Sequence, residues 1–267
     1  MKLALKIRDF LRWCIRSLCA DFLEDISRVQ QFNISTAEMH KKAFLPFKNK
    51  HNGQDIVVVA CGPTAKDYQP VKGAIHIGVN RSIQLPQISL DYLFVMDATD
   101  KRRTNSMSDY NNYRPGLCTK FYGISGDFLD NKLFVPSESD TIKANAIRYR
   151  TDNLIGLRIC NNGRFLYDIS TQPLTDCGSV VFSALQFALW TNPKRIFLVG
   201  CDCSSTGHFN SSGDKTGLPP TMRQSYMRLK DFAEAYYPDT EIISVNPVGL
   251  KGLFKDWNQK DGPLDDK

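Results

Sequence analysis

One short apolar run and the turn that ends it constrain this chain more than any other stretch. Ile56–Ala60 is uninterrupted and largely β-branched, which is typical of a strand buried on both faces of a parallel sheet. The residues Cys61-Gly62-Pro63-Thr64 then end the run at once. Glycine permits a tight turn, proline suits the first position of a helix, and threonine is a good helix cap. The stretch therefore predicts a strand, a turn and a helix N-terminus in immediate succession.

This turn is a candidate site for an anion. The first N–H groups of a helix have no partner within the helix, and the helix dipole adds positive potential at the same end. Gly62 would let a phosphate approach the backbone closely. The turn lacks both the G-x-G-x-x-G pattern of dinucleotide sites and the lysine of a P-loop. The alternative is an ordinary strand-to-helix turn, and these residues alone do not decide between the two.

Apolar runs of the same kind recur along the chain, separated by polar turns and by two longer apolar segments. This alternation predicts an α/β fold for residues 55–267, after an N-terminal extension at 1–54. The expected architecture is a Rossmann-like, mostly parallel sheet with helices on both faces. Weaker strand signals lie at 120–124 and 133–135. The stronger predictions are strands at 74–79, 92–96, 195–199 and 241–245, and helices at 179–190 and from 221 to about 237.

The basic excess of the chain is concentrated at its N-terminus. The 267 residues carry a net charge of +6, and 42% of them are hydrophobic, as in one large globular domain with a terminal extension. Beyond the first sixteen residues the charge is nearly balanced, which argues against a nucleic-acid partner. Those sixteen residues contain Lys2, Lys6, Arg8, Arg12 and Arg16 against Asp9.

Cysteine usage and hydropathy indicate a cytoplasmic location. Eight cysteines without C-x-x-C pairs favour buried thiols in a reducing compartment over a disulfide scaffold. No apolar stretch approaches the roughly 20 residues that a membrane-spanning helix needs. Charges at Lys6, Arg8 and Arg12 interrupt any apolar core of a signal peptide.

The N-terminal extension is predicted to contain one amphipathic helix. Residues 2–29 have apolar side chains at steps of three and four, and residues 30–54 are polar, like a linker. One interpretation is a helix bound to the anionic inner face of the cytoplasmic membrane; the other is a helix packed on its own domain or on another subunit of a homo-oligomer. Asp21, Glu24 and Asp25 reverse the charge and favour the second interpretation. The apolar stripe comprises Leu3, Ile7, Phe10, Cys14, Leu18, Phe22 and Ile26.

Polar residues follow several predicted strands at the point where each ends. Parallel strands place their carboxyl ends at one edge of the sheet, where α/β proteins bind ligands. Asn80, with Ser82 two residues later, could hydrogen-bond a base or a ribose, although asparagine is also a common turn residue. Asp97 and Asp100 could together hold Mg²⁺, or Asp97 could accept ribose hydroxyls or cap its loop. Asp202, Ser204, Ser205 and His208 follow the strand at 195–199.

Three stretches together resemble a known family. ACGPTAKDY, the strand ending GVNRS, and CGSVVFSALQFALWTNPKRIFLVGCDCSS resemble, in order and spacing, the bacterial CMP-sialic-acid-dependent sialyltransferases of the lipooligosaccharide type. They also resemble the broader group that includes the archaeal hydroxymethylpterin pyrophosphokinases. The resemblance covers roughly residues 55–100 and 175–205, which is under a third of the chain, and it implies a Rossmann-like sheet with a Gly-Pro-Ser/Thr turn.

The resemblance also suggests which residues bind the nucleotide. Gly62, Pro63 and Thr64 match the family's nucleotide-contacting turn, although Cys61 stands where the family has asparagine. Asn80 matches the family's asparagine at the end of the second strand.

The second half of the family pattern is less well kept. Gly178 matches a glycine before the long helix, and the hydroxyl that precedes it in the family is moved to Ser179 or lost. Asp202 matches the aspartate of the family's Gly-Ile-Asp. Ser204 and Ser205 stand where the family has tyrosines that hold the donor phosphate, and this departure puts the donor in doubt more than the fold.

The resemblance implies an inverting, metal-independent glycosyltransferase with no cofactor besides its donor. It would move a sialic-acid-like sugar from a CMP-sugar to a cell-surface glycan acceptor, such as a lipooligosaccharide or capsule, with residues 104–176 as an acceptor or lid region. The acceptor hydroxyl needs a general base, and histidine is the usual one near neutral pH. Of the four histidines, His208 alone is predicted in a polar loop at the ligand edge, so it is the candidate base; an ordinary surface histidine is the alternative.

Three other functions fit parts of the same pattern. An ATP-dependent pyrophosphokinase would use Mg²⁺ held by Asp97 and Asp100. A zinc site could be built from Cys201, Cys203 and His208, but the C-x-C spacing suits structural zinc poorly and no fourth ligand is evident. A non-catalytic scaffold could keep the sheet and bind a partner through the N-terminal helix.

Overall fold

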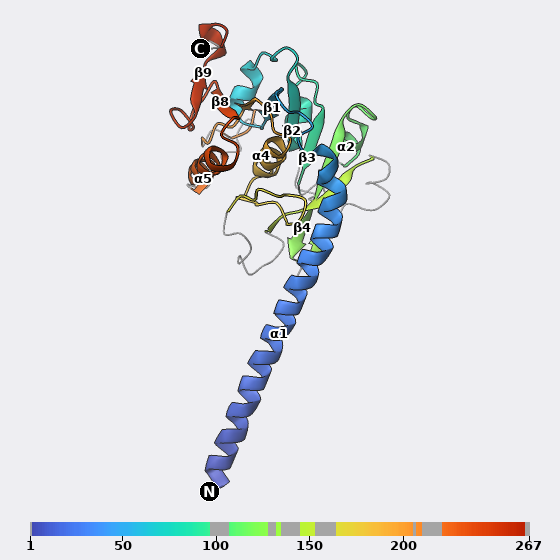
Figure 1. The fold of residues 1–267 in the computed structure, drawn as a ribbon, viewed down its shortest axis with the longest axis vertical. Helices are drawn as coiled ribbons and strands as arrows, with labels where there is room; N and C mark the ends of the chain where they lie inside the picture. The colour runs from blue at the N-terminus through green and yellow to red at the C-terminus, as the bar shows by residue number, and fades with distance from the viewer. Residues whose placement is uncertain are drawn as a thin grey trace.

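The chain forms one sheet domain from which a single long helix projects (Figure 1). The computed structural model describes residues 2–96, 107–127, 132–134, 145–152, 164–204, 207–209 and 221–264.

The sheet confirms the predicted α/β, Rossmann-like class. Strands lie in the order β5-β4-β3-β2-β1-β7-β8-β9, and β6 pairs with β4. Every pairing is parallel except that of β4 with β5. The strands are β1 (Asp55–Val59), β2 (Ile75–Val79), β3 (Tyr92–Val95), β4 (Thr119–Asp127), β5 (Lys132–Phe134), β6 (Ile147–Arg150), β7 (Arg195–Val199), β8 (Glu241–Val245) and β9 (Lys255–Trp257).

The strand order reverses direction at β1. From β1 the chain builds outward through β2 and β3, and it then returns to place β7 on the other side of β1. Val57 pairs with His76 of β2 and with Phe197 of β7, so β1 is central and buried on both sides. In open α/β sheets, the crevice at the carboxyl ends of the two strands flanking such a reversal is the usual ligand site. We therefore expect a ligand site at the carboxyl ends of β1 and β7.

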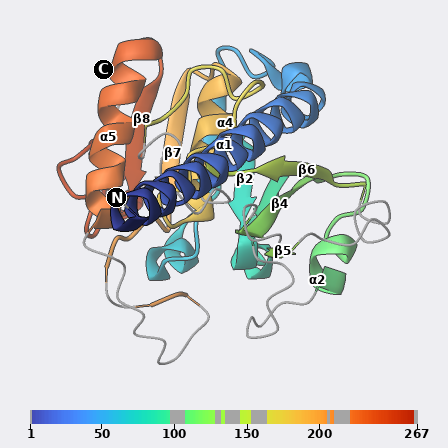
Figure 2. The same ribbon diagram turned by 90° about the horizontal axis from the view of Figure 1, so that it is seen from below.

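Helix α4 (Val180–Trp190) lies in the middle of the domain. All eleven of its residues are buried, as expected from the sequence VVFSALQFALW, which has no polar face. Its Phe187 ring lies 5.1 Å from the ring of Tyr92 and 5.3 Å from that of Phe94, both on β3. Figure 2 shows α4 between α5 (Thr221–Tyr236) and the docked end of α1 (Lys2–Phe44). Because helices lie on both sides of it, α4 is shielded from solvent along its whole length.

Helix α1 is longer than predicted. The sequence predicts a helix at 2–29 followed by a polar linker to residue 54, whereas α1 runs without interruption from Lys2 to Phe44. The linker prediction is wrong because the second half of α1 docks on the domain through a stripe that contains polar side chains. Within the described part of the chain, no helix has the length and apolarity to cross a membrane. The docked stripe consists of Phe32, Thr36, His40, Ala43 and Phe44, all buried.

The end of α1 is fixed by contacts with residues far along the chain. The Trp190 indole N–H donates a 2.9 Å hydrogen bond to the Phe44 carbonyl, and the Phe44 ring stacks on Phe121 of β4 at 5.6 Å. The short 3₁₀ helix η1 (Leu45–Phe47) then places Phe47 in the same aromatic cluster. The end of the extension is therefore part of the hydrophobic core.

A second helix covers the opposite face of β4. Lys120 and Tyr122 flank Phe121 and point away from α4, because side chains alternate along a strand. The Lys120 ammonium donates to the Asn111 carbonyl at 3.1 Å, and the Tyr122 hydroxyl donates to the Asn111 side chain at 2.7 Å. Asn111 belongs to α2 (Met107–Asn112), so helices lie on both faces of the sheet, as predicted.

The short elements have little or no signal in the sequence. Neither β6 nor β9 is predicted from the sequence. Both are at the margins of the sheet, where only one residue of β6 and none of β9 is buried, so hydrophobic periodicity is weak. The remaining short elements are the 3₁₀ helices η2 (Pro63–Asp67), η3 (Asn80–Gln84) and η5 (Gln259–Asp261).

Candidate functional site

The turn after β1 and the loop after β7 run side by side at the reversal point. The Ala60 N–H donates to the Val199 carbonyl and the Gly62 N–H donates to the Gly200 carbonyl, both at 2.8 Å. A Cβ placed on Gly62 would lie 2.5 Å from the Asp202 carboxylate and would also overlap the Gly200 carbonyl. Glycine is therefore required at position 62 by close packing of the two loops, rather than by its backbone angles, since its φ is −68°.

Asp202 joins the two loops through its carboxylate. The Thr64 N–H donates to one carboxylate oxygen at 2.9 Å, and the Thr64 hydroxyl donates to the other. Asp202 is only 6% exposed, and burial raises the pKa of its carboxyl, while the two hydrogen bonds from Thr64 oppose that rise. The anion expected at the N-terminus of the helix after Gly62 is thus present as an internal carboxylate.

The loop after β8 supports Asp202 from behind. The Gly249 N–H donates to the Asp202 carbonyl at 2.7 Å. A Cβ at position 249 would lie 2.8 Å from that carbonyl and would overlap the Cys203 carbonyl as well. Cys203 has a left-handed backbone with φ +45°, so the chain turns sharply there. This contact is not predicted from the sequence, where Gly249 is the only signal for it.

The segment that carries His208 returns to the turn after β1. The Phe209 N–H donates to the Cys61 carbonyl at 2.9 Å, and Phe209 itself is buried. His208 is half-buried beside this contact. The structure therefore brings the candidate base to the same edge of the sheet as Gly62 and Thr64, and its role as a base stays a prediction.

Asn80 connects the ends of β2 and β3. Its side-chain oxygen accepts a 3.1 Å hydrogen bond from the Met96 N–H, and its own φ of +44° ends β2. The Cys61 thiol donates to the Val79 carbonyl at 3.3 Å, which ties the turn after β1 to the same point. Ser82, the other predicted nucleotide contact after β2, is only 1% exposed, so its side chain is buried. Asn80 therefore has a structural role in addition to the nucleotide contact predicted for it.

The start of α4 lies at the same edge of the sheet. Gly178 has a φ of +79° and donates its N–H to the Asp176 carboxylate at 2.8 Å, and the Ser179 hydroxyl caps the helix by accepting from the Val181 N–H at 3.4 Å. Neighbouring residues of α5 then connect this start to the loop after β7. The Ser225 side chain hydrogen-bonds the Cys177 thiol, and the Tyr226 hydroxyl hydrogen-bonds the Cys201 thiol.

The structure therefore assembles part of the predicted site. Gly62, Thr64 and Asp202 are in direct contact, and Pro63 opens η2 between them. Ser204 is half-buried in the loop that follows Asp202. Asp97, Asp100 and Ser205 lie outside the described residues, so their predicted roles are neither supported nor opposed.

The described residues contain no group of three or more metal-ligating side chains. Burial raises the pKa of the Cys201 thiol well above its ordinary value and that of Cys203 to about 11, so both are neutral thiols near pH 7.

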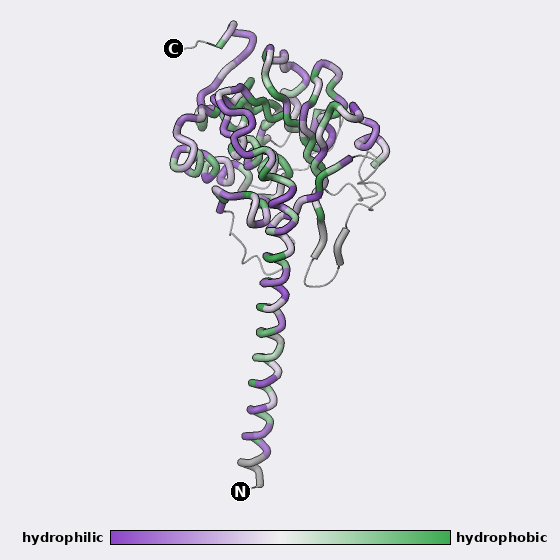
Figure 3. The backbone as a smooth tube through the Cα atoms, turned by 45° about the vertical axis from the view of Figure 1, so that its right-hand side comes forward, coloured by the Kyte–Doolittle hydropathy of each residue, from purple (hydrophilic) through white to green (hydrophobic). Residues whose placement is uncertain are grey.

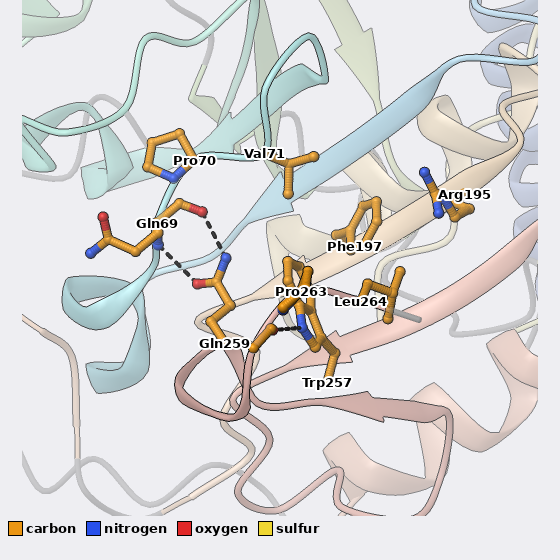
Figure 4. Close-up of a pocket in the computed structure, with 10 residues that line it drawn as sticks. Gln69, Pro70, Val71, Arg195, Phe197, Trp257, Gln259, Pro263 and Leu264 are labelled. Carbon is orange, nitrogen blue, oxygen red and sulfur yellow. Dashed lines mark hydrogen bonds between the residues drawn. The ribbon is translucent and has the colours of Figure 1, made fainter. Parts of the chain in front are cut away.

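A hollow of about 530 Å³ lies elsewhere on the domain (Figure 4). It is lined mainly by apolar side chains, among them Val71, Phe197, Trp257 and Leu264. The Gln259 side chain closes one end by a reciprocal pair of hydrogen bonds with the backbone of Gln69, at 2.8 and 2.7 Å. These polar groups satisfy one another, and the Arg195 guanidinium, which also lines the hollow, is paired with the Asp55 carboxylate at 2.6 Å.

The fold and the site define a class. The protein is a Rossmann-like α/β protein whose candidate site lies at the reversal point of its sheet, between the turn after β1 and the loop after β7.

Comparisons with known proteins add two similar structures. No family model matches the sequence, and no curated protein matches it. The MAf glycosyltransferase of Magnetospirillum magneticum AMB-1 is similar with 14% identity and a TM-score of 0.49, over 92% of this chain and 43% of that chain. The sialyltransferase CstII of Campylobacter jejuni, in complex with the substrate analogue CMP-3FNeuAc, is similar with 12% identity and a TM-score of 0.46, over 79% of this chain and 89% of that chain. This chain thus spans less than half the length of the first of these proteins.

Proposed function

We propose that this protein is a glycosyltransferase that uses a CMP-activated, sialic-acid-like sugar as donor and a cell-surface glycan as acceptor. One observation carries the proposal: Gly62, Thr64 and Asp202 meet at the reversal point of the sheet, where the family resemblance of the sequence expects the nucleotide.

The nucleotide would lie along the carboxyl edge. Gly62 packs closely against Asp202, whose carboxylate can accept hydrogen bonds from ribose hydroxyls. Because Asp202 occupies the N–H of Thr64, we assign the single donor phosphate to the start of α4 near Gly178 and Ser179. Helix N–H groups can stabilise the charge of that phosphate without a metal ion.

The transfer step would be an in-line displacement with inversion. His208 would take the proton of the acceptor hydroxyl while the oxygen of that hydroxyl bonds to the anomeric carbon. The bond from that carbon to the phosphate oxygen breaks, and its electrons leave with CMP. Contact between Phe209 and Cys61 supports this role, because it holds the His208 segment beside the nucleotide turn.

Ligand-dependent thermal unfolding is the direct test of the donor class. CMP without metal should raise the melting temperature, because a ligand that binds only the folded state stabilises it. Stabilisation by ATP with Mg²⁺ and not by CMP would instead indicate the pyrophosphokinase. No response to either nucleotide would indicate the non-catalytic scaffold.

A transfer assay would then examine the reaction itself. CMP-sialic acid with lipooligosaccharide or capsule fragments is the first donor and acceptor set to use, and release of CMP with chelator present would support metal independence. We expect the reaction in the cytoplasm, since the seven described cysteines are all free thiols.

A further inference from the structure

The first half of α1 exposes an apolar face outside the domain. None of the described side chains from residues 6 to 27 is buried, and the helix stands clear of the sheet domain (Figures 1 and 3). Several of its large apolar side chains are more than half exposed: Ile7, Phe10, Leu11, Trp13, Ile15, Leu18 and Leu23. An apolar surface of this length on one helix is typical of a face that packs against another element.

This exposed face continues the face with which α1 docks on its own domain. With about 100° between successive helical residues, the whole stripe falls within a sector of about 120°. Phe10, Trp13 and Leu23 lie outside it, about 100°, 160° and 120° around the helix from the centre of the stripe. The stripe is formed by Ile7, Leu11, Ile15, Leu18, Ile26, Val29, Phe32, Thr36 and His40, of which Phe32, Thr36 and His40 are buried against the domain.

That continuity places the domain and the exposed stripe on the same side of α1. A flat lipid surface that approached the stripe would contact the domain first, so it could not contact the exposed stripe along its whole length. A single helix is only about 10–12 Å in diameter, so it can lie beside the exposed part of α1 where a plane cannot. The geometry therefore favours a helical partner over a membrane.

The charges along α1 identify that helix as a second copy of α1. Residues 2–20 contain five basic residues and only Asp9 as an acid, whereas residues 21–27 contain Asp21, Glu24 and Asp25 and no basic residue. Two copies in parallel would align the basic segments, which repel within the screening length of about 10 Å. Two antiparallel copies align the basic segment of each with the acidic segment of the other.

We propose that residues 7–26 of α1 pair antiparallel with the same residues of a second copy of this chain. The stripe is nearly symmetric about residues 16 and 17, so Ile7 would face the partner's Ile26 and Ile15 would face the partner's Leu18. The overlap is about 30 Å long and ends where α1 begins to contact its own domain. The two domains lie at opposite ends of the helix pair.

The mass of the full-length protein in solution provides the first test. The chain has a mass of 30.2 kDa, so light scattering after gel filtration should give about twice that value. Leu18→Asp should convert the dimer to a monomer, because it places a charge in the centre of the stripe. Leu23→Asp is the matched control: Leu23 is 63% exposed and Leu18 70%, but Leu23 is off the stripe, and this variant should remain dimeric.

Disulfide trapping tests the antiparallel orientation. In a background with Cys14→Ser and Cys19→Ser, proteins carrying Ile7→Cys or Ile26→Cys would be mixed and oxidised. The antiparallel pair should form the mixed 7–26 crosslink in preference to 7–7 and 26–26 crosslinks.

Four outcomes would overturn the proposal. They are a monomeric wild-type protein, a dimer unaffected by Leu18→Asp, a dimer lost equally with Leu23→Asp, and preferential crosslinking of like positions. If the wild-type monomer instead floated with vesicles of anionic phospholipid and Leu18→Asp abolished flotation, the exposed stripe would be a membrane-binding surface. Circular dichroism of both aspartate variants would establish that each is folded.

Discussion

The Asp202 carboxylate accepts a 2.9 Å hydrogen bond from the Thr64 N–H, across 138 residues of sequence. The two residues follow β1 and β7, the central pair of strands at the point where the strand order reverses. A buried acid is thus used to hold together the two loops between which α/β proteins usually place a ligand. The candidate site depends on this contact both for its shape and for its charge.

Removing the carboxylate should reduce both stability and nucleotide binding. Asp202→Ala leaves the N–H and the hydroxyl of Thr64 without their acceptor, so the free energy of unfolding should fall by about 1–3 kcal/mol. Urea denaturation would measure the loss, and CMP titration would measure binding. Asp239→Ala, at an exposed position, is the control and should change neither quantity. Unchanged stability in Asp202→Ala would contradict the structural role given to this carboxylate.

Adding one methyl group at position 62 should separate the two loops. In Gly62→Ala the new Cβ would lie 2.5 Å from the Asp202 carboxylate. Overpacking of this kind should lower the free energy of unfolding by about 1–3 kcal/mol. CMP affinity should fall with stability, because both loops must shift. Gly73→Ala is the comparison: its Cβ meets nothing within 4 Å, and only its left-handed backbone opposes the change. If both variants lost stability but only Gly73→Ala lost CMP affinity, the site would not lie where we place it.

The docking of α1 should weaken in acid through His40. Burial lowers the pKa of His40 to about 4, and its neutral ring bridges Ile169 and Arg150, with hydrogen bonds of 3.0 Å to the Ile169 carbonyl and 2.9 Å from the Arg150 N–H. The pKa of the unfolded state is about 6.5, so this group destabilises the fold as pH falls from about 6.5 to 4. A shift of this size corresponds to roughly 3 kcal/mol over that interval.

A variant without a titrating ring isolates this effect. His40→Gln should be less stable at pH 7, and its stability should depend less on pH between 6.5 and 4 than that of the wild type. Burial also lowers the pKa values of His51 and His76, so part of the acid sensitivity should persist in the variant. Identical pH profiles for the two proteins would show that His40 does not titrate in this range.

Replacing the candidate base should affect chemistry more than binding. His208→Ala should lower kcat for sugar transfer by roughly 100-fold or more, the typical contribution of a general base, while the Kd for CMP stays nearly constant. Steady-state rates and calorimetric titration would separate the two effects. Full activity in His208→Ala would remove this residue from the mechanism and leave the donor assignment intact.

The central part of the fold was accessible from the sequence because its signals are local. Runs such as Ile56–Ala60 specify buried parallel strands with little ambiguity, whereas the polar residues directly after them fit both a ligand site and an ordinary turn. The docked half of α1 was not accessible, since Thr36 and His40 are polar and only their positions on the helix reveal the buried face. The hydrogen bonds between Thr64 and Asp202 could not be predicted from the sequence either. A motif can predict that an anion is needed at a helix start, but not that a residue of the chain itself supplies it.

The central position of α4 has a consequence for the order in which the chain can fold during synthesis. The docking end of α1 leaves the ribosome early, yet Trp190, which hydrogen-bonds the Phe44 carbonyl, follows it by 146 residues. Phe121, on which the Phe44 ring stacks, also appears long after Phe44. During translation the N-terminal part of a chain emerges first. The end of α1 therefore cannot dock until most of the sheet and α4 have been synthesised. Until then its apolar face is a target for chaperones or for the same helix of a neighbouring nascent chain.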